Sequence, residues 1–133
     1  MASLSPLVVK IGDFGVSKRV QNDNTALRTS CGAMEYTAPE ISIHGNSEYT
    51  NTVDIWSLGC VVHKILTGRT PFTNPELWNY AYGPTGFPEQ HLATKRISES
   101  GVEFIKCLME KDPGRLSAKQ ARKAAWLNVV EET

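Results

Sequence analysis

The sequence of 133 residues has no charge imbalance and no long apolar run. Fourteen basic residues balance fourteen acidic ones, which leaves no net charge to favour nucleic acid or a membrane surface. No apolar run reaches the ~18 residues that span a bilayer. Residues 1–6 lack the basic start and apolar stretch of a signal peptide. We therefore expect neither a nucleic-acid nor a membrane partner.

Cysteine is also scarce, and Cys31, Cys60 and Cys107 are widely spaced. Such a set does not form a disulfide framework, which favours a reducing intracellular compartment, cytoplasmic or nuclear. Cys60 and His63 have the spacing of two metal ligands on one helix face, but no second pair accompanies them. We expect a core cysteine and a surface histidine instead.

The hydrophobic pattern predicts a mainly α-helical chain with one short β element. Residues 7–12 begin with a β-branched run and end at glycine, which is typical of a strand. Residues 13–51 are polar and glycine-rich without a sustained period, which is typical of a long functional loop. Helices are then expected over residues 54–66, 75–82 and 99–110, and from 117 towards 127. The first has little polar face, so we expect it to be buried on most sides.

Signals at the helix ends support these ranges. Gly68 is expected to end the first long helix. Ser98 or Ser100 is expected to cap the helix over residues 99–110, and Ser100 with Glu103 has capping-box spacing. Residues 117–120 fit a second capping box.

Four motifs occur in a fixed order. Asp-Phe-Gly at 13–15 follows the expected strand, and Ala-Pro-Glu at 38–40 begins 25 residues after Asp13. Asp-Ile-Trp-Ser-Leu-Gly occupies 54–59, and Asp-Pro-Gly-Arg-Leu-Ser occupies 112–117. One tripeptide alone is a weak signal, but this order and spacing are specific.

The arrangement resembles eukaryotic protein serine/threonine kinases, in which DFG and APE motifs bracket the activation segment. The resemblance covers nearly all of residues 1–133 and implies a partial kinase domain from the carboxy-terminal (large) lobe. It places the strand before DFG at 7–12, the activation segment at 13–40 and a helical remainder at 52–130. The segment is most similar to the calcium/calmodulin-dependent and checkpoint-type groups.

The DFG motif is where the resemblance implies a cofactor site. Asp13 is expected to coordinate the Mg²⁺ that bridges the phosphates of ATP. Phe14 is expected to pack inward, and Gly15 to permit the backbone turn into the loop. The alternative, without the resemblance, is that Asp13 is an ordinary aspartate in a turn.

The resemblance also implies three structural residues. Glu40 is expected to form a bidentate charge pair with Arg115, which joins the activation segment to the last helices. Asp54 is expected to brace the catalytic loop of a complete kinase through backbone hydrogen bonds.

The activation segment holds the expected regulatory residues. Thr29 is the first candidate for an activating phosphosite, with Thr25 and Ser30 as weaker candidates, because a phosphate orders such a loop by pairing with arginine. The alternative for Thr29 is a solvated loop threonine.

Gly32, Ala33 and Tyr36 belong to the loop that docks protein substrates in the family. Related kinases have a threonine at Ala33 that hydrogen-bonds the catalytic aspartate, and alanine cannot donate that bond.

Several kinase elements do not occur within these 133 residues: the GxGxxG loop, the strand lysine and the His-Arg-Asp catalytic loop. Without them we expect the isolated chain to transfer no phosphate, although ATP–Mg²⁺ transfer to protein hydroxyls is implied for the family. The alternative is a pseudokinase-like interaction module that binds docking proteins. If the chain is such a fragment, it lacks the upstream helix that packs on residues 54–66 in a complete kinase, and a large apolar face is expected to be exposed there.

Overall fold

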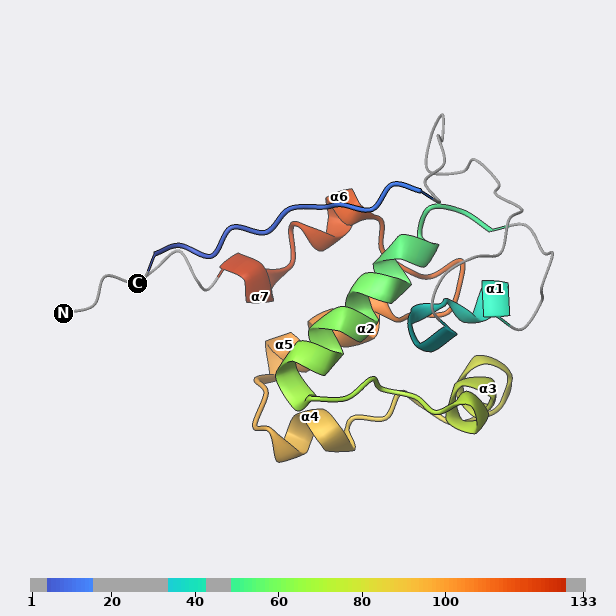
Figure 1. The fold of residues 1–133 in the computed structure, drawn as a ribbon. Coiled ribbons are helices and arrows are strands. Elements are labelled where there is room, and N and C mark those ends of the chain that lie inside the picture. Colours follow the sequence, from blue (N-terminus) through green and yellow to red (C-terminus); the bar gives the residue numbers. More distant parts are fainter. Residues whose placement is uncertain (1–4, 16–33, 43–48, 129–133) are drawn as a thin grey trace.

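A computed structural model describes residues 5–15, 34–42 and 49–128 of the chain. The described elements are η1 (Met34–Tyr36), α1 (Pro39–Ser42), α2 (Val53–Thr67), α3 (Asn74–Tyr82), α4 (Gln90–Thr94), α5 (Glu99–Leu108), α6 (Ala118–Ala121) and α7 (Ala125–Asn128). α2 runs through the middle, and the shorter helices surround it (Figure 1). The described part is therefore mostly helical, as predicted.

α2 is the longest helix, and its ends follow the expected rules. The predicted range 54–66 differs from the observed Val53–Thr67 by one residue at each end. Gly68 follows with a φ of 83°, and its N–H donates to the carbonyl oxygen of Lys64 at 2.8 Å. Glycine adopts this left-handed conformation without steric cost, which explains why the helix ends here.

The core lies where α2 packs against α5. α2 contributes Trp56 and Cys60, and α5 contributes Ile105 and Leu108, all of them almost fully buried. An aromatic cluster extends this core towards α3 and the loop before it. Its rings are those of Trp56, Phe72, Tyr80 and Phe87, with Trp56 and Phe72 stacked at 5.9 Å and Phe72 and Tyr80 at 5.0 Å.

The opposite side of α2 is exposed, which corrects the expectation that this helix is buried on most sides. Leu58, Val61 and Ile65 are exposed, Ile65 by 76%. Their spacing of three and four residues places them on one helix face. We call these three residues the α2 stripe. No described segment covers the stripe, and it is the apolar face that the sequence predicted would be open.

The predicted strand at 7–12 is wrong. These residues have no strand conformation, and their apolar side chains at Leu7, Val8, Val9 and Ile11 are all exposed. A β-strand forms only when its backbone groups pair with a neighbouring strand. The described residues contain no second strand to supply that partner, so strand propensity alone did not produce one.

The third and fourth predicted helices are confirmed in place but not in every detail. Ser98, rather than Ser100, caps α5 by accepting a hydrogen bond from the Gly101 N–H at 3.2 Å. The Ser117–Gln120 capping box is present. The final helix, however, is divided into α6 and α7.

No described helix is long and apolar enough to cross a membrane.

Candidate functional site

The charge pair that the sequence predicts is present and bidentate. The Arg115 guanidinium donates to both carboxylate oxygens of Glu40, at 2.6 Å and 3.0 Å. The Arg115 side chain is fully buried and that of Glu40 is 13% exposed. Two residues 75 positions apart are therefore joined by charge-assisted hydrogen bonds in a largely desolvated setting.

Arg115 also holds three other parts of the fold. Its Nε donates to the carbonyl oxygen of Glu110 at 2.9 Å, and Nη1 donates to that of Thr52 at 3.0 Å. Its guanidinium lies 5.1 Å from the ring centre of Trp56. A buried arginine with so many partners is well satisfied. The pair fixes the end of the 13–40 segment to the start of α2 and to the turn before α6.

Tyr36 is tied to α2 at two points. The Ser57 hydroxyl donates to the Tyr36 carbonyl oxygen at 2.7 Å, and the Lys64 ammonium donates to the Tyr36 hydroxyl at 3.1 Å. The same hydrogen bond raises the pKa of Lys64 above its ordinary value. Of the three predicted substrate-docking residues, Tyr36 is placed firmly. Gly32 and Ala33 lie outside the described residues.

The DFG residues sit in an open setting. Asp13, Phe14 and Gly15 are all exposed, and Asp13 has a left-handed φ of 58°. Phe14 is 66% exposed, so the expectation that it packs inward is wrong. Inward packing needs a hydrophobic core beside the ring, and residues 5–15 are exposed along their whole length.

Asp13 is not part of a ready-made metal cluster among the described residues. They contain no group of three or more His, Cys, Asp or Glu side chains arranged around a common metal position. Mg²⁺ requires near-octahedral oxygen ligation, usually from carboxylates together with phosphates and water. Asp13 offers one exposed carboxylate of this kind.

The other predicted residues are not brought to one site. Asp54 lies exposed in the first turn of α2. The phosphosite candidates Thr25, Thr29 and Ser30 lie outside the described residues.

A protein-family model, the protein kinase domain, matches residues 2–127. This chain belongs to the protein kinase family. It is 37% identical to the serine/threonine-protein kinase RAD53 of Saccharomyces cerevisiae, over 93% of the chain and 17% of that protein. It is 34% identical to the serine/threonine-protein kinase cds1 of Schizosaccharomyces pombe, over 92% of the chain and 28% of that protein.

The structure of this chain is also similar to solved structures of kinases. The crystal structure of Rad53 1–466 in complex with AMP-PNP matches with a TM-score of 0.60 and 39% identity, over 74% of this chain and 27% of that one. The chain therefore spans well under half the length of these relatives. It corresponds to the carboxy-terminal part of the large lobe of a serine/threonine kinase, as the motifs indicated.

Sequence reasoning missed several contacts of this kinase fragment. Ser57 and Lys64 were not singled out, yet they hold Tyr36. The spacing of seven residues, two helical turns, puts both on one face of α2, but nothing in the sequence says that η1 packs there. Thr73 and Glu76 form a capping box at the start of α3 that was also overlooked, although the spacing was visible.

His63 is fully buried, which corrects the expectation of a surface histidine. Its Nδ1 lies 2.7 Å from the Arg69 carbonyl oxygen, so Nδ1 carries the proton and donates. Nε2 is buried and has no hydrogen-bond partner among the described residues. The rings of Phe87 and His91 face it at 6.5 Å and 6.3 Å. Burial lowers the pKa of His63. The hydrogen bond to the Arg69 backbone opposes this shift, and the charges of His91 and Arg69 add smaller lowering contributions.

We expect this histidine to make the fold sensitive to acid. The folded-state pKa of His63 lies below the ordinary 6.5. Between these two pKa values the imidazole is protonated in the unfolded chain and neutral in the folded chain. Stability is full above about pH 6.5 and falls as the pH drops through the folded-state pKa. Urea midpoints measured from pH 7.5 to pH 5 should show this loss. His63→Phe should flatten the profile, and His91→Gln, which removes only a smaller contribution to the shift, should change it much less. A profile unchanged by His63→Phe would contradict the assignment.

Proposed function

We propose that this chain forms the helical base of a serine/threonine kinase large lobe, with the activation segment anchored to it by Glu40 and Arg115. The observation that supports the proposal is the buried, bidentate pair between the APE glutamate and an arginine 75 residues later. In this proposal Asp13 is the Mg²⁺ ligand, Thr29 the activating phosphosite, and Gly32, Ala33 and Tyr36 part of the surface that meets protein substrates. Asp54 supports the catalytic loop.

We further propose that the chain by itself does not transfer phosphate. Phosphoryl transfer depends on positioning the nucleotide and on stabilising charge with metal ions and cationic groups. The described residues supply one exposed carboxylate for that task, Asp13. The complete kinase would act inside the cell on protein hydroxyls, with ATP and Mg²⁺ as cofactors. The comparisons do not favour the alternative of a non-catalytic interaction module.

A phosphate-transfer assay tests this proposal. Purified chain is incubated with radiolabelled ATP, Mg²⁺ and a basic protein substrate, beside the Asp13→Ala variant and a complete related kinase domain. We expect the chain and the variant to give the same background, because neither has a nucleotide clamp. Transfer by the chain clearly above that of Asp13→Ala would overturn the proposal.

A further inference from the structure

Residues 7–12 form an apolar segment that no described strand pairs with. The side chains of Leu7, Val8, Val9 and Ile11 are between 72% and 91% exposed. Figure 1 shows residues 5–15 as an extended run outside the helices. Valine and isoleucine favour strands, and an exposed strand-prone segment is a template for pairing with another chain. The segment therefore needs a partner that supplies both apolar side chains and backbone hydrogen bonds.

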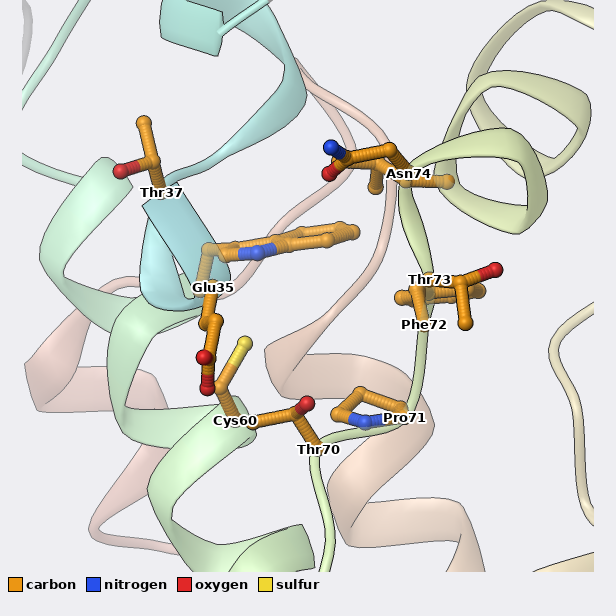
Figure 2. A pocket seen from close by; sticks show the side chains of 10 residues that line it. Glu35, Thr37, Cys60, Thr70, Pro71, Phe72, Thr73 and Asn74 are labelled. Carbon is orange, nitrogen blue, oxygen red and sulfur yellow. The ribbon is translucent and has the colours of Figure 1, made fainter. Parts of the chain in front are cut away.

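Two other surfaces of the described residues do not meet this need. A hollow lies between η1, α2 and the segment that leads into α3, and Figure 2 shows Glu35, Thr37 and Asn74 around it. Covering these polar groups with an apolar segment costs free energy unless they gain hydrogen bonds. The α2 stripe is apolar, but a helix already uses its backbone N–H and C=O groups internally. It therefore has no backbone groups to offer an extended segment.

The segment does match a second copy of itself in antiparallel orientation. With Val9 opposite Val9 of the other copy, Leu7 lies opposite Ile11 and Val8 lies opposite Lys10. Successive side chains of a strand point to opposite faces. Leu7, Val9 and Ile11 of both copies therefore share one face. Apolar cross-strand pairs of this kind stabilise a sheet.

Other registers are less favourable. An antiparallel pair centred on Lys10, or a parallel pair in register, places Lys10 opposite Lys10, and like charges directly opposite each other are destabilising. Centring the pair on Val8 places Pro6, which has no backbone N–H to donate, opposite Lys10. A shift by one residue turns the apolar set of one strand to the wrong face. The chain has no net charge, so no long-range repulsion opposes the association of two copies.

We propose that two copies of this chain associate through residues 7–12, which form an antiparallel two-stranded ribbon with Val9 on the two-fold axis. The interface uses the same segment of both copies, so the assembly closes as a dimer. A two-stranded ribbon is only marginally stable by itself, so the dimer forms reversibly and at high protein concentration. The association is independent of phosphate transfer and of the proposed function.

Sedimentation equilibrium of the full chain tests the association. The mass should rise with concentration from that of one chain towards that of two. Val9→Lys places two lysines opposite each other at the centre of the ribbon and should weaken the dimer by about tenfold. Val61→Lys makes the same change on the exposed α2 stripe and should leave the dimer unchanged. A mass that stays at one chain, a mass that rises beyond two, or an equal effect of the two variants would each overturn the inference.

Cysteine cross-linking tests the register. The background carries Cys31→Ser and Cys107→Ser, and Cys60 is buried. With oxidised glutathione, Val9→Cys should link two copies, because facing residues of an antiparallel pair lie ~4.5–5.5 Å apart, within reach of a disulfide. Leu7→Cys should not, because the two cysteines lie four residues apart along the ribbon, or ~13 Å. Equal cross-linking of both variants, as in a parallel pair, would overturn the register. Tryptophan fluorescence of each variant verifies that it is folded.

Discussion

Arg115→Ala should lower the free energy of unfolding by about 3–5 kcal/mol, the range found when one partner of a buried ion pair is removed. The variant leaves the Glu40 carboxylate, only 13% exposed, without its partner. It also removes the donors to the carbonyl oxygens of Glu110 and Thr52. Urea unfolding followed by tryptophan fluorescence measures the loss.

A surface ion pair offers the matched control for this experiment. Lys106 contacts Glu89 at 2.7 Å, but both side chains are well exposed. Solvent screens such a pair and its net contribution is small. Lys106→Ala should therefore leave the urea midpoint nearly unchanged. If Arg115→Ala and Lys106→Ala lower the urea midpoint by the same amount, the buried pair does not stabilise the fold as its geometry indicates.

Gly59→Val should lower the free energy of unfolding by a similar amount, through steric overlap. A Cβ atom at Gly59 would overlap the Met109 Cγ and would lie 3.2 Å from the Leu108 Cβ. Both neighbours are fully buried where α2 packs against α5. A larger side chain in a packed core costs about 1–3 kcal/mol and sometimes more. We expect the free energy of unfolding of Gly59→Val to fall by about 3 kcal/mol, measured from the urea midpoint.

Two further variants separate overpacking from a general effect of valine. At Gly86 an added Cβ meets nothing within 4 Å, so Gly86→Val should leave stability close to that of the unchanged chain. Gly59→Val combined with Met109→Ala should lose less stability than the two single variants lose together, because the shorter side chain at 109 leaves room for the valine. If the double variant loses more stability than the two single variants lose together, overlap with Met109 is not the cause of the destabilisation by Gly59→Val.

The helical part of the fold was predictable because its signals are local. The apolar pattern of α2 ends at Gly68, whose left-handed φ of 83° is a conformation that glycine accepts freely. The Ser117 capping box is likewise contained within four residues. The short α4 was missed because a helix of five residues, Gln90–Thr94, is too short to show a period.

The features that failed depend on distant partners. Residues 7–12 have strand propensity, but no described strand pairs with them. His63 appeared to be a surface residue because its burial depends on Phe87 and His91, which lie far along the chain. The contact between Glu40 and Arg115 was predicted from the resemblance to kinases, since no local pattern links residues 75 positions apart.

The most direct test of this account is a double-mutant cycle on Glu40 and Arg115. Urea unfolding is measured for Glu40→Gln, Arg115→Met and the double variant, and the coupling energy is the departure from additivity. A bidentate buried pair predicts coupling of about 2 kcal/mol or more, within the range for residues in one charge network. Additive effects would contradict the claim that this pair anchors the activation segment to the helical lobe.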